Sequence, residues 1–315
     1  MCDDTTEAEN EQWLAQRRLG RREVGIGTGA VVASALVGCG PATTPASGPS
    51  SVVGQTPTPT PEPSGDDATP PRTTSRMVAI ETPHGTAEAF FVTPSEGRHP
   101  GVLIWPDIAG LRPAFEAMAT RLATQGHAVL AVNPYYRSTK LPLFSTFDDF
   151  RSDEGKAKIG PMREALTNEA IASDGAAFVA WLDAQPEVDT DRKIGTTGYC
   201  MGGPFTFRTA AASGRVGAIG SFHGGGLVTE APDSPHALLP KMQAAALVCI
   251  AQNDDERQPE AKTTLKEAAE AAGRAAEIEV YPAQHGWCVT DSPVYDEPQA
   301  ERAWSRLLAT FEQHL

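Results

Sequence analysis

Cysteine is scarce in this 315-residue chain, and the few cysteines present do not form a metal-binding or disulfide-rich pattern. No two of them have the CxxC spacing typical of zinc ligands, and they are not clustered as in small disulfide-bonded domains. We therefore expect neither a bound metal nor a disulfide framework, and each cysteine has to be explained singly. The five are Cys2, Cys39, Cys200, Cys249 and Cys288.

Basic residues are also in deficit. The chain has 26 lysines and arginines against 40 aspartates and glutamates, which gives a formal net charge of -14. Because nucleic acid attracts proteins through positive charge, nucleic acid is a poor candidate partner. No glycine-rich nucleotide fingerprint joins an expected strand to a helix, and we expect no cofactor. With 40% hydrophobic residues, the chain can still bury a sizeable core.

The apolar stretch near the N-terminus, residues 24–38, is too short and too rich in glycine for a membrane-spanning helix, which needs about 20 residues. It follows four arginines within residues 17–22, a combination that indicates a signal segment of the twin-arginine type. It ends in Leu36-Val37-Gly38-Cys39, which resembles a bacterial lipobox. An ordinary cleavage site with an incidental cysteine is the alternative.

We therefore expect residues 1–39 to be a signal segment whose Cys39 is lipidated. The protein would then be extracytoplasmic, held by acyl chains to the periplasmic or cell-surface side of a bacterial membrane. Residues 40–75 are rich in Pro, Thr and Ser with almost nothing apolar to bury, which predicts a disordered linker of extended polyproline geometry. The folded catalytic domain is expected over residues 76–315.

From residue 76 onward, strand-like and helix-like segments alternate. Two short runs at 77–80 and 87–92 flank a turn at 83–85 and indicate a hairpin at a sheet edge. The later segments form βαβ units, which predict an α/β fold with a doubly wound, mainly parallel sheet and helices on both faces. Its strands are expected at 101–105, 128–132, 194–198, 217–222, 246–251 and 275–281, and its helices at 114–125, 169–185, 262–272 and 299–314.

The motif Gly198-Tyr199-Cys200-Met201-Gly202 stands where an expected strand ends and a helix should begin near Gly203. A nucleophile between two glycines at such a turn is typical of a nucleophile elbow, because only small residues fit beside so tight a turn. The N-terminus of the following helix would favour the reactive thiolate of Cys200. The other interpretation, a buried structural thiol, suits Cys249 within an apolar strand better.

A nucleophile of this kind needs an acid and then a histidine later in the chain. Asp254 and Asp255 follow one expected strand, and His285 follows the next. We expect His285 to exchange a proton with Cys200, while Asp254 orients the imidazole. Asp255 is the alternative acid, ranked second because Asp254 stands first beyond the strand.

An oxyanion hole requires two backbone N–H donors aimed at the developing negative charge. Met201, directly after the nucleophile, is expected to supply one of them. The loop after the strand at 101–105 should supply the other, and Ile108 is the candidate in that loop.

Together these motifs resemble the dienelactone hydrolase family of the α/β-hydrolase superfamily, over roughly residues 76–315. The family's elbow, Gly-Tyr-Cys-hydrophobic-Gly-Gly, is matched by residues 198–203. Matching segments elsewhere are Asp107-Ile108-Ala109-Gly110-Leu111, Asn133-Pro134-Tyr135-Tyr136-Arg137 and Gln284-His285-Gly286-Trp287. The resemblance implies an α/β-hydrolase fold that cleaves an ester or lactone with no metal or cofactor.

The resemblance also implies substrate-binding roles for Asp107, Arg137 and Tyr135. In the family an acidic residue, usually glutamate, contacts the resting thiol, and Asp107 takes that position here. An arginine matching Arg137 helps to bind the substrate carboxylate in the chlorocatechol-pathway enzymes, but Val289 replaces the second such arginine. We therefore predict a Cys-His-Asp hydrolase of a small ester or lactone whose substrate need not be dienelactone.

Two alternatives stay open at this point. A lipid-anchored protein could use this fold to bind a ligand or a cell-envelope partner without catalysis, and its Cys200 would then be unreactive. A thiol redox protein is disfavoured because no resolving cysteine is adjacent in the sequence, although a disulfide between Cys200 and Cys288 would support it.

Overall fold

The computed structural model describes the backbone of residues 4–24 and 71–315, and the side chains of residues 5–17 and 71–315. The predicted lipobox with Cys39 and most of the predicted linker at 40–75 lie outside the described residues. Residues 4–15 belong to the same compact unit as residues 71–315. Within the described part of the chain, no helix is both long and apolar enough to cross a membrane.

One eight-stranded sheet forms the centre of the domain. Its strands are β1 (Thr73–Thr82), β2 (Gly85–Pro94), β3 (Gly101–Trp105), β4 (Ala128–Val132), β5 (Ile194–Tyr199), β6 (Val216–Phe222), β7 (Ala245–Ala251) and β8 (Ala276–Tyr281). They lie in the order β1-β2-β4-β3-β5-β6-β7-β8. The hairpin β1–β2 is antiparallel and joins β4 antiparallel, whereas all pairs from β4 to β8 are parallel.

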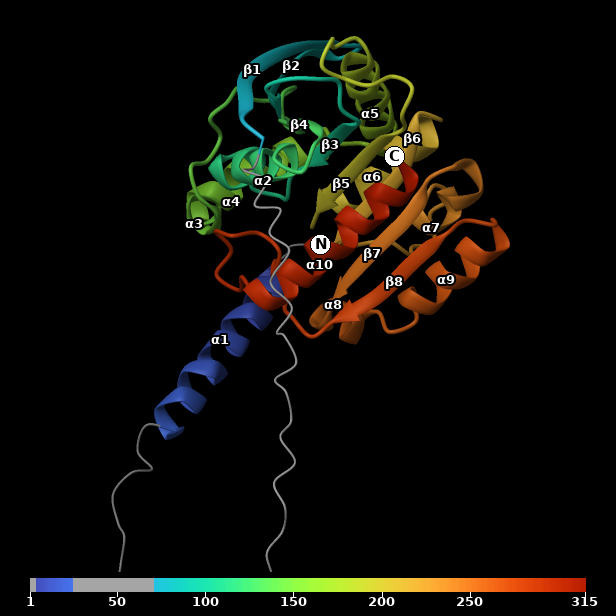
Figure 1. Ribbon diagram of the computed structural model, residues 1–315. Helices are drawn as coiled ribbons and strands as arrows, with labels where there is room; N and C mark the ends of the chain where they lie inside the picture. Colours follow the sequence, from blue (N-terminus) through green and yellow to red (C-terminus); the bar gives the residue numbers. More distant parts are fainter. Residues whose placement is uncertain (1–3, 25–70) are drawn as a thin grey trace, which may run out of the picture. The chain divides into compact units, whose positions relative to one another are not determined.

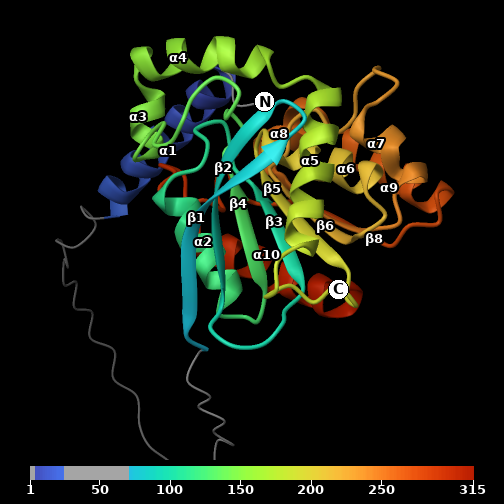
Figure 2. The same ribbon diagram turned by 90° about the horizontal axis from the view of Figure 1, so that it is seen from above.

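Helices cover both faces of this sheet. The helices of the described residues are α1 (Asp4–Val24), α2 (Pro113–Ala123), α3 (Phe147–Arg151), α4 (Asp153–Glu164), α5 (Asn168–Asp183), α6 (Gly202–Ala212), α7 (Pro235–Leu238), α8 (Gln252–Arg257), α9 (Ala261–Ala271) and α10 (Glu297–His314), with a 3-10 turn at Leu239–Lys241. Helices α2 and α10 pack on one face, and α5, α6 and α9 pack on the other (Figure 1). Figure 2 shows α3 and α4 beyond the ends of the strands rather than against either face.

The burial of each element follows its sequence pattern. Strands β3 and β4 are continuous apolar runs and are buried at every residue, because helices cover both of their faces. Helix α10 is amphipathic, and Ala303, Trp304, Leu307 and Phe311 recur at helical spacing on its buried side. Its first turn is capped by Asp296, whose side chain accepts a hydrogen bond from the Gln299 N–H.

The predicted doubly wound parallel sheet with an edge hairpin is confirmed, and β3 and β4 have the predicted bounds. Strand β1 begins earlier than expected, at Thr73, because Thr73 pairs with Pro94 on β2. The segment after β7, predicted as a loop, is the short helix α8. Helices α3 and α4 were not predicted.

Candidate active site

The predicted nucleophile, acid and base all follow the carboxyl ends of parallel strands. Cys200 follows β5, Asp254 lies in α8 directly after β7, and His285 follows β8. Because the carboxyl ends of parallel strands meet at one edge of a sheet, this topology brings the three segments together. Cys200 and His285 line the same small cavity there.

The turn that carries Cys200 is a strained elbow. Cys200 has a φ of 51°, a left-handed conformation that is uncommon for residues other than glycine. A Cβ atom on Gly198 would lie 2.0 Å from the Gly202 carbonyl oxygen, and one on Gly202 would lie 2.4 Å from the Trp105 carbonyl oxygen. The two glycines therefore let the turn close on itself and press against the end of β3.

Asp254, and not Asp255, contacts the candidate base. The Asp254 Oδ2 lies 2.7 Å from the Nδ1 of His285, whereas the Asp255 Oδ1 accepts from Lys262 Nζ at 2.6 Å. The neighbouring Asn253 fixes the backbone, since its Oδ1 accepts from the His285 N–H at 2.8 Å. The His285 ring is thus held at Nδ1 by a carboxylate, the arrangement expected of a catalytic base.

The surroundings of His285 favour its protonated form. Burial opposes a charge on this ring, but the carboxylate of Asp254 and the sulfur of Cys200 outweigh it and raise the pKa of His285 to about 10. The ring is fully buried, and the Cys200 side chain interacts with it besides Asp254. Because Nδ1 is engaged by Asp254, Nε2 is the nitrogen available for proton transfer.

The two candidate oxyanion donors are linked through one tyrosine hydroxyl. Tyr135, which follows β4, donates its hydroxyl proton to the Ile108 carbonyl oxygen at 2.8 Å, and the Tyr135 hydroxyl oxygen lies 3.4 Å from the sulfur of Met201. All three side chains are buried. Tyr135 therefore positions the oxyanion loop against the elbow, and it is not among the residues found to line the cavity that contains Cys200.

Asp107 lies in the cavity of Cys200, as predicted, but it is held by an arginine. The guanidinium of Arg112 donates to both Asp107 oxygens, at 2.7 and 2.9 Å, and on its other edge to both oxygens of Asp291 at 2.8 Å. Burial raises the pKa of Asp107 above its ordinary value, although Arg112 opposes this. Arg112 was not among the predicted site residues, because nothing in the sequence near position 112 indicates its contact with the distant Asp291.

Arg137, predicted to bind substrate, does not line the small cavity that contains Cys200. Its guanidinium donates to both oxygens of Asp174 on α5, at 2.5 and 2.8 Å, and the Tyr136 hydroxyl donates to the same carboxylate at 2.7 Å. Asp174 is 1% exposed, and a carboxylate so buried needs a cationic partner. The physical reason for the difference is therefore an internal ion pair that the sequence did not show.

His223 belongs to the site, although its place before three glycines in the sequence suits a packed or hydrogen-bonded histidine equally well. It follows β6, has a φ of 39°, and its Nδ1 accepts from the backbone N–H of Cys200 at 3.1 Å. Its ring lies 4.9 Å from that of His285 between centroids. Burial, aided by His285, lowers the pKa of His223 well below its ordinary value, so it is a neutral ring. Its place at the end of the strand beside β5 was the available signal.

The glycines after His223 explain how its loop reaches the elbow. A Cβ atom on Gly203, in the first turn of α6, would lie 2.6 Å from the Cα of Gly224. Only a pair of glycines permits so close an approach of the two backbones. This contact holds His223 beside the nucleophile.

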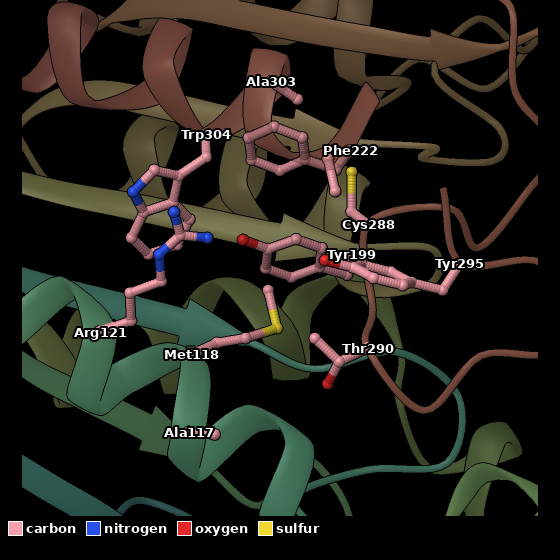
Figure 3. Close-up of a pocket in the computed structure, with 11 residues that line it drawn as sticks. Ala117, Met118, Arg121, Tyr199, Phe222, Cys288, Thr290, Tyr295, Ala303 and Trp304 are labelled. Atoms are coloured by element: carbon pink, nitrogen blue, oxygen red, sulfur yellow. The ribbon is translucent and has the colours of Figure 1, made fainter. Parts of the chain in front are cut away.

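Cys288 lies apart from Cys200, in a second cavity. This cavity of about 130 Å³ lies between α2 and α10 and is lined by Tyr199, Phe222 and Trp304 besides Cys288 (Figure 3). Burial raises the pKa of the Cys288 thiol well above its ordinary value. The structure therefore gives no support to a redox pair between Cys200 and Cys288. Among the residues described, no group of histidine, cysteine and acidic side chains is arranged to hold a metal ion.

Comparison of sequences finds one protein family and several relatives. The profile of the Dienelactone hydrolase family matches residues 87–315. A "putative carboxymethylenebutenolidase" of Methylorubrum extorquens is 27% identical over 242 residues, which are 75% of this chain and 80% of that protein. The carboxymethylenebutenolidase of a Pseudomonas species is 26% identical over 218 residues, which are 69% of this chain and 86% of that protein.

Solved structures share the fold. The crystal structure of a "putative dienelactone hydrolase" from Klebsiella pneumoniae matches with a TM-score of 0.65 at 23% identity, over 77% of this chain and 100% of that one. An acylaminoacyl peptidase of Pyrococcus horikoshii matches with a TM-score of 0.57 at 15% identity, over 77% of this chain and 42% of that one. At these identities the likeness establishes the α/β-hydrolase architecture.

Proposed function

The chain belongs to the dienelactone hydrolase family, and we propose that it hydrolyses a small ester or lactone with Cys200 as its nucleophile. One observation carries the proposal. A cysteine strained at a φ of 51° lies in an elbow turn beside His285, whose Nδ1 is 2.7 Å from Asp254. Strain of this kind is typical of a nucleophile held in place for reaction.

In the first half-reaction the Cys200 sulfur attacks the carbonyl carbon, and the carbonyl oxygen becomes an oxyanion. The N–H groups of Met201 and Ile108 are the proposed donors to this oxyanion. His285 then gives its Nε2 proton to the leaving alkoxide as the C–O bond breaks, which leaves a thioester on Cys200. The raised pKa of His285 keeps that proton available at neutral pH.

In the second half-reaction a water molecule attacks the thioester carbonyl. His285, now neutral, takes a proton from this water at Nε2, and the Cys200 thiolate leaves as the carboxylic acid forms. Asp254 holds Nδ1 in both steps, so the ring keeps one orientation toward the sulfur. The scheme requires no metal or cofactor.

We propose that Asp107 positions the loop that carries Ile108 and does not exchange a proton with the Cys200 thiol. Both of its oxygens are engaged by Arg112, and one also accepts from the Ala109 N–H at 2.9 Å. A carboxylate tied in this way holds the loop of Ile108 in register with the elbow. Rotation of Asp107 toward Cys200 would take from the buried Arg112 one of its two carboxylate partners and leave it with Asp291 alone.

The substrate proposed is a small ester or lactone that need not carry a carboxylate. The relatives named carboxymethylenebutenolidase act on a lactone by their name, but Arg137 is engaged by Asp174 here. Val289, which lines the cavity, supplies an apolar wall where the family resemblance implied a second arginine. The cavity thus offers apolar contact near the reacting carbonyl.

Substitution of the nucleophile tests the mechanism. We expect Cys200→Ala to abolish hydrolysis of a panel of aryl esters and small lactones, and wild-type protein to show a mass increase by one acyl group on Cys200 when a slow ester is used. The matched control is Cys288→Ala, which should keep wild-type kcat/KM. Full activity in Cys200→Ala, or an acyl group found on another residue, would contradict the proposal.

We also propose that the enzyme acts outside the cytoplasm, anchored to a bacterial membrane through Cys39. The support is in the sequence alone: the arginines in residues 17–22, the apolar stretch after them and the lipobox-like Leu36-Val37-Gly38-Cys39. Two or more acyl chains give stable anchoring, since each buried methylene contributes about 0.8 kcal/mol.

A further inference from the structure

We propose that residues 4–15, the start of α1, are a built-in inhibitor that closes the mouth of the catalytic cavity until they are displaced or removed. The proposal rests on the proposed function, because it concerns access to Cys200. One face of the helix lines the same cavity as Cys200 and His285, at Thr6, Glu7, Asn10, Glu11 and Leu14. The positions recur at intervals of three or four residues (6, 10 and 14; 7 and 11), so they share one side of the helix.

The helix binds directly to the loops that carry the acid and the base. Asn10 Nδ2 donates to the carbonyl oxygen of His285 at 2.9 Å. Glu9 accepts from Asn253 Nδ2 at 2.9 Å, and Asn253 is the residue that also holds the His285 N–H. These contacts place the helix over the catalytic residues themselves.

Arg257 joins the helix to the triad acid. Its guanidinium donates to the Thr6 hydroxyl oxygen at 2.9 Å and to the Asp254 Oδ1 at 2.8 Å, and it lies 3.6 Å from Glu9. Thr6 is 1% exposed, so the polar contact is sealed from solvent. A charge-assisted bond in such a place is stronger than one on an open surface.

Opposite charges match across the rest of the contact. Glu7 pairs with Lys156 on α4 at 2.5 Å, and Glu11 pairs with Arg151 on α3 at 2.9 Å. The acidic face of residues 7–11 thus meets a basic rim contributed by α3, α4 and α8. This complementarity identifies the occupant of the rim as an acidic helix, namely the chain's own N-terminal segment.

The closed cavity is too small for a substrate. With the helix in place the volume beside Cys200 is about 20 Å³. That is room for about one water molecule, whereas sites for small-molecule ligands occupy about 300 Å³ or more. Cys200 itself is 1% exposed. An ester can therefore reach the sulfur only when the helix leaves.

The proposed signal segment supplies a way to remove the helix. Cleavage before Cys39 would take residues 4–15 away with residues 1–38, so the cut that exposes the lipidated cysteine would also open the enzyme. Activity would then be confined to protein that has been exported and processed. The acidic helix would keep the precursor inactive on the other side of the membrane.

The test measures access to Cys200 separately from catalysis. In the full 315-residue chain, Glu7→Lys combined with Glu11→Lys places lysines against Lys156 and Arg151. We expect iodoacetamide to label Cys200 about tenfold faster in this variant than in the wild type, with a parallel rise in aryl ester hydrolysis. Ala8→Lys with Gln12→Lys, at exposed positions of the same helix, is the matched control and should label at the wild-type rate.

A second form of the experiment removes the helix without changing it. A site-specific protease sequence inserted after Ser50 allows the full chain to be cut and the N-terminal fragment to be separated. We expect faster labelling of Cys200 after separation, and slowing on addition of a synthetic peptide of residues 4–17. An unchanged labelling rate in both the charge-reversed and the cut protein would overturn the inhibitor proposal. Faster labelling with no hydrolysis in any form would support it and overturn the proposed function instead.

Discussion

Two adjacent aspartates with different partners allow a matched test of the triad acid. Asp254 contacts His285 Nδ1, and Asp255 contacts Lys262. We expect Asp254→Asn to lower kcat for aryl esters by 100-fold or more, since the amide favours the wrong tautomer of the ring (about 10⁴-fold in a comparable triad). Asp255→Asn should stay within about twofold of the wild type, because it loses only a partly exposed ion pair. Equal losses in the two variants would show that neither aspartate is specific to the mechanism.

The choice of acid shows what the sequence could and could not predict at this scale. Order along the chain and position after a strand were enough to select Cys200, Asp254 and His285, because these depend on local pattern and on the rule that strand ends meet. The partners of Arg137 and Asp107 could not be predicted. Arg137 pairs with Asp174, which lies on a separate helix, α5. Arg112 is close to Asp107 in the sequence, but its guanidinium is also held by the distant Asp291. Single-sequence patterns carry no signal for such contacts.

The charge on His285 predicts a pH dependence of stability. Its pKa is near 6.5 in an unfolded chain and is raised to about 10 in the folded protein, so the folded state binds the proton more tightly. The stabilisation is complete below pH 6.5 and is lost as the pH rises from about 6.5 to 10. About 1.4 kcal/mol accompanies each unit of pKa difference, which amounts to a few kcal/mol across this window.

Urea unfolding at several pH values checks this expectation. The difference in free energy of unfolding between the wild type and His285→Gln should fall steadily between pH 6.5 and 10. Asp255→Asn provides the control and should keep the wild-type dependence. A difference that stays constant over this range would mean that His285 does not hold its extra proton in the folded state.

At the scale of elements, the elbow between β5 and α6 depends on the absence of a side chain at Gly198. A Cβ atom there would meet the Gly202 carbonyl oxygen at 2.0 Å, a backbone atom that cannot move aside. We expect Gly198→Ala to lower the free energy of unfolding by about 3 kcal/mol and to remove esterase activity, because the turn must open. Gly160→Ala, at an exposed position of α4 with open space around it, should instead stabilise by about 0.5–1 kcal/mol. Both are measured by urea unfolding and ester hydrolysis, and wild-type stability in Gly198→Ala would contradict the tight turn.

The elements that escaped prediction have a common property. The strands and the helices α2, α5, α9 and α10 were predicted because their apolar residues recur with a clear period. Helix α4 contains Gly155, Gly160 and Pro161, and only Gly155 and Ile159 of its residues are buried, so no apolar stripe marks it. Helix α3 is five residues long and is defined by a capping box between Thr146 and Asp149. Such segments owe their form to capping and to tertiary contact more than to periodicity.

At the scale of the whole molecule, the N-terminal segment and the folded domain meet at the cavity of Cys200. From the sequence we predicted that residues 1–39 are a signal segment and that residues 76–315 form a separate catalytic domain. The contacts of residues 4–15 with Asn253, Arg257 and His285 connect the two parts. Polar residues at helical spacing do not show which surface they will meet, so this connection could not be predicted.

Cys39 is the residue on which export, anchoring and release of the proposed inhibitor depend together. If the lipobox is processed as we propose, the wild-type protein from membranes should begin at Cys39, carry acyl chains and partition into detergent. The Cys39→Ser variant cannot be lipidated. Because cleavage of a lipoprotein signal segment requires that modification, the variant should keep residues 1–38. We therefore expect the variant to remain in the aqueous phase and to hydrolyse aryl esters at least about tenfold more slowly per mole than the processed wild type. Intact mass spectrometry and ester hydrolysis of the same samples check this. A cleaved Cys39→Ser protein with wild-type activity would contradict the proposed lipid anchor. An uncleaved variant with wild-type activity would be consistent with the anchor and would contradict the proposed inhibitor.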